Sequence, residues 1–247
     1  MKRIKIFLKS LFRAIGLDIK LIHTNHKKSQ SVVNNINQEN KWLSDYCIKT
    51  IVDIGANEGQ FALKMREIFP EASIFSFEPI TEVYNKLVNN FHNDKYFKAY
   101  NFGLGDKEEQ IKFWLNEYSP SSSILEMTNH LNHFDYAKKN KEIEIKIRSL
   151  DSFKDKINLV SPYLIKIDVQ GYEDKVIRGG LDILTKAQII ITEVSFVQLY
   201  NDQVLFDKIY SQLTQLNFSY VGNFEQLYSP LNNQILQADA IFIKNNI

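Results

Sequence analysis

The chain has 247 residues, of which 44% are hydrophobic and 13% aromatic, so it can bury the core of one substantial globular domain. Its formal net charge is +1, yet residues 2–28 hold eight basic residues and one acidic residue, which leaves an acidic main body. Such a body excludes a broad nucleic-acid surface, because that surface needs a basic face. A single cysteine, Cys47, excludes an internal disulfide framework and a cysteine-cluster metal site.

The first residues predict an amphipathic basic helix. Apolar residues recur at helical spacing over residues 3–16, with Lys5, Lys9 and Arg13 on another face. Such a helix can lie on an anionic membrane surface through residues 1–20, or pack on the domain or on a second copy in a homodimer. Both alternatives stay open. Without a small-residue cleavage site or an apolar run of ~18 residues, we expect a cytoplasmic protein, with peripheral attachment to the inner membrane face as one alternative.

Two regions are expected: an N-terminal helical extension over 1–46 and one domain over 47–247. In the second region strand-like runs alternate with helical stretches, which predicts an α/β fold with a parallel sheet covered on both faces. Residues 109–149 interrupt the alternation with two β-like segments, 110–115 and 142–147. We predict strands at 50–54, 73–77, 96–102, 162–168, 187–194, 218–222 and 237–243, and helices near 58–69, 80–92, 171–185 and 203–216.

The strand at 50–54 runs into a glycine turn that is acidic. Dinucleotide binding requires three glycines as G-x-G-x-x-G, so that backbone N–H groups can hold pyrophosphate. Only two of these glycines are present, and Asp53 and Glu58 would repel an anion. A cationic ligand with a ribose and no phosphate fits this turn, and S-adenosylmethionine is such a ligand. The residues predicted to bind it here are Asp53, Gly55, Asn57 and Gly59.

Two later segments are predicted to complete this cofactor site. Glu78 ends the second strand, 25 positions after Asp53, where a carboxylate can hold the ribose hydroxyls. A carboxylate at a helix entry, ahead of Pro79, would have the same pattern. The turn after the third strand offers backbone and an acid to an adenine ring, although a plain hairpin turn would look alike. The residues predicted there are Asn101, Gly103 and Asp106.

Charged residues also stand in a strand that should be buried. Lys166 and Asp168 alternate with isoleucines and a valine, and two residues apart on a strand point the same way. Burying charges is costly unless they are paired or used, so the pair either steadies the sheet or faces donor and acceptor. Glu193 ends the next strand and is expected beside Asp168. No histidine or cysteine cluster supports a metal site.

Together these motifs resemble the FkbM-type family of S-adenosylmethionine-dependent methyltransferases over about residues 48–243. The segment 166–173 is the most specific of them, and Gln170 departs from the family, which often has glutamate there. The resemblance implies a Rossmann-like, seven-stranded class I methyltransferase sheet with an antiparallel last strand. It also implies methyl transfer to a hydroxyl of a small-molecule or glycan acceptor, in polysaccharide or secondary-metabolite biosynthesis. The matching segments are 52–59, 77–79, 103–106, 149–151, 166–173 and 238–242.

Methyl transfer from a sulfonium requires alignment of donor and acceptor and removal of the hydroxyl proton. We predict Asp168 as the base, with Glu193 as the alternative and Lys166 orienting the carboxylate or the nascent oxyanion. Two other functions stay open. One is a catalytically inactive scaffold, and the other is a nicotinamide-dependent oxidoreductase, which the missing third glycine disfavours.

Overall fold

The computed structural model describes residues 41–116 and 140–245. The chain divides into two compact units, Met1–Trp42 and Leu43–Ile247, and the fold below is that of the second. The predicted amphipathic helix, with its membrane or dimer contact, lies outside the described residues. None of the helices in the described ranges is both long enough and apolar enough to cross a bilayer.

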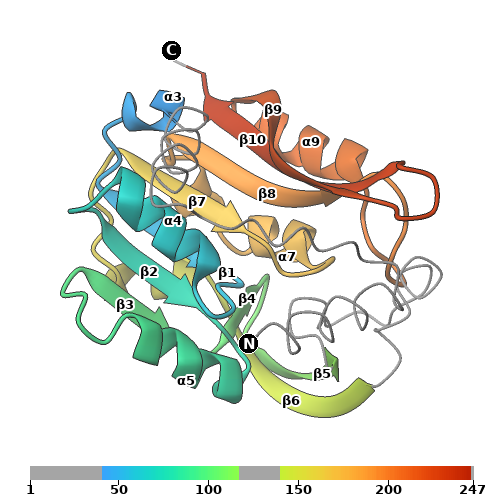
Figure 1. Cartoon of the computed structure of the whole chain (residues 1–247), viewed down its shortest axis with the longest axis horizontal. Helices are drawn as coiled ribbons and strands as arrows, with labels where there is room; N and C mark the ends of the chain where they lie inside the picture. The colour runs from blue at the N-terminus through green and yellow to red at the C-terminus, as the bar shows by residue number, and fades with distance from the viewer. Residues whose placement is uncertain (1–40, 117–139, 246–247) are drawn as a thin grey trace, which may run out of the picture. The chain divides into compact units, whose positions relative to one another are not determined.

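The second unit is built around a seven-stranded sheet (Figure 1). Strand β10 runs antiparallel to both of its neighbours, whereas the other adjacent pairs are parallel. This confirms the predicted α/β sheet with its antiparallel last strand. In spatial order the strands are β3 (Phe97–Tyr100), β2 (Ser73–Phe77), β1 (Thr50–Ile54), β7 (Tyr163–Ile167), β8 (Ile189–Ser195), β10 (Ile235–Lys244) and β9 (Phe218–Tyr228).

Helices connect the strands largely where the sequence predicts them, with one difference. The single helix expected at 171–185 is two helices, because the chain turns at Gly179 and Gly180. A Cβ on Gly179 would lie 1.8 Å from the Gly105 carbonyl oxygen, so this close approach requires glycine. The described helices are α3 (Lys41–Ser44), α4 (Gln60–Ile68), α5 (Thr81–Asn90), the 3₁₀ helix η3 (Asp151–Lys156), α7 (Glu173–Arg178), α8 (Leu181–Leu184) and α9 (Phe206–Gln215).

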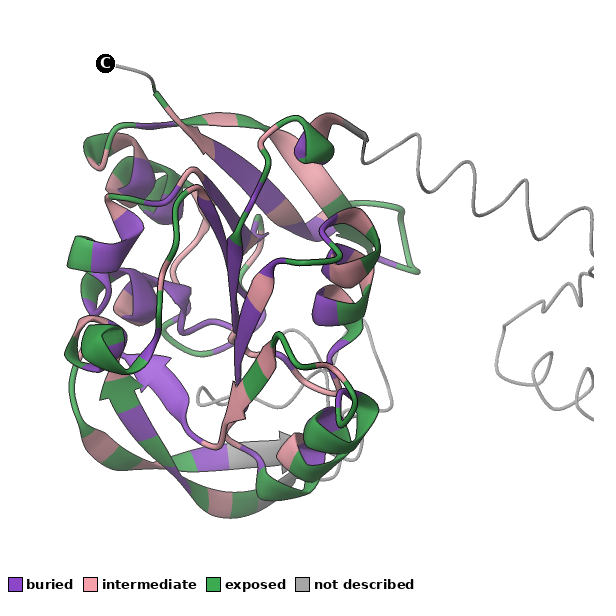
Figure 2. Cartoon of the chain, turned by 90° about the vertical axis from the view of Figure 1, so that its left-hand side faces the viewer, coloured by how far each residue is buried: buried purple, intermediate pink, exposed green. Residues whose placement is uncertain are grey.

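The central strands are buried on both faces, as the purple strands in Figure 2 show. Val52, Ile165 and Ile190 lie in register across β1, β7 and β8 and belong to the core that also includes residues of α7, α8 and α9. Because side chains alternate along a strand, Asp53 and Lys166 project from the opposite face. A charged side chain at such a position needs a partner, because an unpaired buried charge is costly.

The inserted segment forms a second, three-stranded sheet. It is ordered β4 (Gly103–Gly105), β6 (Asn140–Ser149) and β5 (Glu109–Asn116), with β5 antiparallel and β4 parallel to β6. The two predicted β-like segments are therefore confirmed, while the turn expected around Gly103 is a short strand. This sheet lies near the carboxyl ends of β1 and β2 (Figure 1).

Candidate active site

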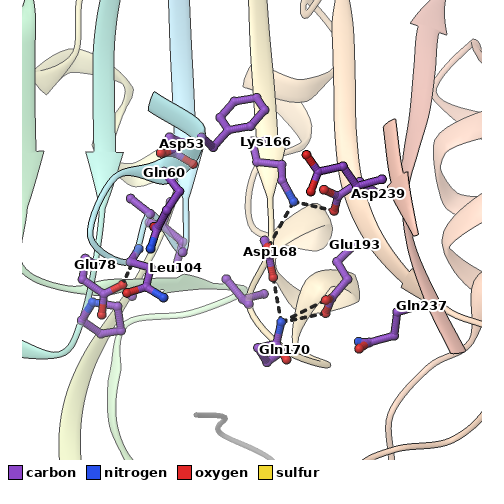
Figure 3. A pocket seen from close by; sticks show the side chains of 18 of the residues that line it. Asp53, Gln60, Glu78, Leu104, Lys166, Asp168, Gln170, Glu193, Gln237 and Asp239 are labelled. Carbon is purple, nitrogen blue, oxygen red and sulfur yellow. Dashed lines mark hydrogen bonds and ion pairs between the residues drawn. The ribbon is translucent and has the colours of Figure 1, made fainter. Parts of the chain in front are cut away.

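A cavity of about 580 Å³ lies at the carboxyl ends of β1, β2, β7 and β8, against β9 and β10 (Figure 3). Ligands of open α/β sheets bind at this edge, where the strand order reverses between β1 and β7. Eight of the eleven predicted site residues line the cavity: Asp53, Gly55, Asn57, Glu78, Gly103, Lys166, Asp168 and Glu193.

Three predicted residues, Gly59, Asn101 and Asp106, are not among the residues that line the cavity. A Cβ on Gly59 would lie 2.4 Å from the Phe91 ring, so this glycine allows α4 to approach the end of α5. The Asn101 amide donates to the carbonyls of Glu78 and Pro79 at 3.0 and 3.1 Å. The Asp106 carboxylate pairs with Arg178 at 3.0 Å. Their contacts shape the surroundings of the cavity, and direct contact with a ligand stays a prediction.

The turn after β1 is held closely against its two neighbouring strands. Gly55 has φ +81°, and a Cβ there would lie 1.8 Å from the backbone oxygen of Asp168. The N–H groups of Gly55 and Ala56 both donate to the Phe77 carbonyl at 3.0 Å. The N–H of Asn57 donates to Glu78 Oε2 at 2.9 Å. Because only glycine permits this approach, the turn brings the ends of β1, β2 and β7 into one site.

Two buried carboxylates occupy one side of the cavity. Glu78 accepts from the N–H groups of Asn57 and Ile80, both at 2.9 Å, and burial raises its pKa to about 7 although these hydrogen bonds oppose the shift. Asp53 is 1% exposed, and burial raises its pKa to about 7 against the positive charge of Lys166. A ligand that brings positive charge or hydroxyl donors would favour the ionised form of both groups.

Replacing Asp53 with asparagine is expected to stabilise the protein, and more so at higher pH. The folded chain keeps a proton on Asp53 up to about pH 7, whereas the unfolded chain loses it near the ordinary pKa of 3.8. The folded state thus binds more protons in this window, so the free energy of unfolding of the parent falls as pH rises through it, by up to about 1.4 kcal/mol per pH unit. The free energy of unfolding of Asp53→Asn does not fall in this way, because asparagine has no proton to release.

Urea unfolding of parent and variant at about pH 5 and pH 8 measures the difference. Asp182→Asn, at a side chain that is 65% exposed, controls for the change of acid to amide. A stabilisation by Asp53→Asn that does not grow with pH would contradict the assignment of a buried, partly protonated carboxylate.

The part of the cavity formed by β7, β8 and β10 holds one buried lysine among several acids. Lys166 lies beside Asp53 in the register of β7 and β1, and Asp239 lies beside Glu193 in the register of β10 and β8. The Lys166 ammonium contacts Asp239 at 2.7 Å and Asp168 at 3.2 Å. Burial alone would lower the pKa of Lys166, but the charges of Asp168 and Asp239 raise it above its ordinary value. The lysine therefore stays protonated.

Gln170 links the two candidate bases. Its Nε2 donates to Asp168 Oδ1 at 2.9 Å and to both Glu193 oxygens at 3.0 and 3.1 Å. Its Oε1 accepts from the Tyr200 hydroxyl at 2.8 Å, which fixes the amide so that the nitrogen faces the acids (Figure 3). Burial and the charges of Asp168 and Glu173 raise the pKa of Glu193 well above its ordinary value. An amide at this position therefore separates two acids that would repel each other.

Glu173 holds the loop that carries these groups. Its carboxylate accepts from the N–H groups of Val169 and Gly171 at 3.0 to 3.1 Å. The side chain is buried, and burial raises its pKa to about 7 against these hydrogen bonds. Within the described residues no group of three histidine, cysteine, aspartate or glutamate side chains is arranged to hold a metal ion.

Comparison with known proteins identifies the family. The model of the FkbM methyltransferase domain matches residues 53–220. The chain belongs to the FkbM methyltransferase family. Among curated proteins, it is 32% identical over 161 residues to 2-O-methyltransferase NoeI of Sinorhizobium fredii, covering 62% of this chain and 66% of that protein. It is 29% identical over 142 residues to Methyltransferase 1 of Beauveria bassiana, covering 52% and 57%.

The chain thus spans less than two thirds of the length of these curated relatives. Among solved structures it is similar to the FkbM methyltransferase of Methylobacillus flagellatus, with a TM-score of 0.51 and 13% identity over 79% of this chain and 43% of that one. At this identity the likeness shows the fold.

Four residues of this FkbM family member complete the site but are absent from the residues predicted for it: Gln170, Tyr200, Gln237 and Asp239. Gln170 was noted only as a departure from the family, and its contacts with Asp168 and Glu193 depend on a backbone φ of +54°. Asp239 and Gln237 interrupt the apolar run of β10, as Lys166 interrupts β7. The same reasoning about polar residues in a buried strand could have found both. Tyr200 lies in a loop and gave no such signal.

Proposed function

We propose that the chain is an S-adenosylmethionine-dependent O-methyltransferase that acts on a hydroxyl of a sugar or related acceptor. One observation carries the proposal: a single cavity joins the carboxylates of Asp53 and Glu78 to the acidic pair Asp168 and Glu193. Membership of the FkbM family supports methyl transfer. The similarity to NoeI, a 2-O-methyltransferase, supports oxygen as the accepting atom.

The residues around Glu78 suit a cationic ligand that carries hydroxyls. Asn57 Oδ1 is buried beside the cavity and has no hydrogen-bond partner among the residues that the structure describes, so it can accept from a ligand. Asp53 and Glu78 would repel a pyrophosphate, which argues against a nicotinamide cofactor. Asp53, Asn57 and Glu78 would hold S-adenosylmethionine, which would supply the methyl group from its positively charged sulfur and would leave as the neutral thioether.

On the acceptor side, the protein has to remove one proton from the hydroxyl. Asp168 is the more accessible acid, with a side chain that is 35% exposed, and its two oxygens are held by Lys166 and Gln170. We assign the proton to Asp168, with Glu193 as the alternative base. Lys166 fixes the carboxylate and offsets the charge of the acids, because it contacts both Asp168 and Asp239. A positioned base of this kind typically contributes about 10²- to 10⁴-fold to rate.

The first test is binding of the donor. Glu78→Ala is expected to weaken S-adenosylmethionine binding at least tenfold, or about 1.4 kcal/mol, because it removes the carboxylate from that side of the cavity. Isothermal titration calorimetry with S-adenosylmethionine and, separately, NAD measures both affinities. Glu82→Ala, an exposed acid on α5, is the matched control. Unchanged donor binding by a folded Glu78→Ala variant, or tighter binding of NAD by the parent, would contradict the proposal.

A further inference from the structure

One polar side chain in the cavity has a buried donor with nothing to bind. Gln237 on β10 is 4% exposed, and its Nε2 has no hydrogen-bond partner in the described structure. Figure 3 shows its amide on the β10 side of the cavity, facing the same space as Glu193. Ser195, its register partner on β8, accepts from Gln203 at 2.8 Å instead. Because buried polar groups are normally paired, this amide points to a ligand.

The surroundings of Gln237 define what that ligand offers. Gln237 and Asp239 lie two residues apart on β10, so they face the same way and are separated by ~7 Å along the strand. Asp239 lies beside Glu193, which is joined to Asp168 through Gln170. The site thus presents carboxylates that accept hydrogen bonds and, next to them, one amide that donates. Adjacent hydroxyls match this pattern, since one donates to a carboxylate while its neighbour accepts from the amide.

The charge of the cavity restricts the ligand further. Both lysines among the described lining residues are already paired: Lys166 with Asp168 and Asp239, and Lys64 with Glu225 at 2.8 Å. An acceptor with a phosphate or carboxylate close to the reacting hydroxyl would therefore meet several acids and no unpaired cation of that lining. Like-charge contacts of this kind disfavour binding, so a neutral acceptor is favoured.

We propose that Gln237 is a specificity-determining residue, whose side-chain amide donates to a hydroxyl of a neutral sugar ring while the adjacent hydroxyl lies at Asp168 and Glu193. The inference rests on the proposed function, since it places the acceptor in the same cavity. The inference adds the class of acceptor, a neutral polyhydroxylated ring, and the residue that recognises this ring.

The test is binding of simple glycosides to the full chain saturated with S-adenosylhomocysteine. Saturation-transfer difference NMR with methyl α-D-mannopyranoside as the neutral probe and methyl α-D-glucopyranosiduronate as the anionic one reports binding without turnover. We expect signals from the mannoside and none from the uronate. Gln237→Leu should weaken mannoside binding at least tenfold and leave the calorimetric affinity for S-adenosylhomocysteine unchanged. Gln234→Leu, at an exposed glutamine that is not among the residues lining the cavity, is the matched control and should have little effect.

A second readout keeps the test independent of folding defects. If the Gln237 amide is unsatisfied, Gln237→Leu should keep or raise the thermal unfolding temperature, because it removes a buried donor without a partner. Failure of the parent protein to bind S-adenosylmethionine would overturn the proposed function. If the parent binds the donor, three NMR results would overturn this inference alone: no mannoside signal, uronate binding equal to mannoside binding, or mannoside binding unaffected by Gln237→Leu. A lowered unfolding temperature of the variant would overturn it as well.

Discussion

Asp168→Asn is expected to lower methyl transfer by about 10²-fold or more while S-adenosylmethionine binding stays nearly unchanged. The amide keeps the size of the side chain and can still contact Gln170, but it has no basic oxygen to take the hydroxyl proton. Transfer of tritium from methyl-labelled S-adenosylmethionine to neutral methyl glycosides measures the rate, and calorimetry measures donor binding.

The matched variant is Glu193→Gln, which makes the same change on the neighbouring strand. If Asp168 is the base, Glu193→Gln should have the smaller effect on rate. The opposite ranking would assign the proton to Glu193, whose raised pKa makes it a stronger base than an ordinary glutamate. Loss of donor binding in Asp168→Asn would place Asp168 in the cofactor site, and a rate that depends on added magnesium after chelation would show that the acids hold a metal ion.

The sequence predicts the part of the site that lies at the ends of strands. Asp53 lies near the end of a mostly apolar strand, and Glu78 and Asp168 each follow one directly, so their position along the chain already places them at the carboxyl edge of a parallel sheet. Glycines at turns are less informative. Gly55 approaches Asp168, whereas Gly59 packs against Phe91, and nothing local distinguishes the two turn positions.

Contacts between distant segments explain what the sequence did not predict. The Asn101 amide bonds the carbonyls after β2, and no local pattern tells a side chain that binds backbone from one that binds a ligand. The polar residues Gln237 and Asp239 stand out in an apolar strand, but that they face this site depends on the register of β10 with β8, which is set by pairing across the whole sheet. The break between α7 and α8 likewise depends on the approach of Gly179 to Gly105.

Lys166→Met is expected to destabilise the fold by about 3–5 kcal/mol, because it leaves Asp168 and Asp239 without the cation that both contact. Urea unfolding measures this loss of stability. The control is Lys64→Met, because Lys64 also lines the cavity but is 28% exposed and paired with Glu225. Its expected effect is below about 1 kcal/mol.

The pH dependence of this loss distinguishes two roles of Lys166. The lysine either only steadies the sheet or also keeps the neighbouring acids ionised. Without Lys166 the pKa values of Asp239 and Glu193 rise further, since its positive charge lowers both. Their folded forms then hold protons that the unfolded chain releases, so the destabilisation should be larger at pH 8 than at pH 6. A loss independent of pH would mean that Lys166 does not set the protonation of these acids between pH 6 and pH 8, and would leave it the role of steadying the sheet.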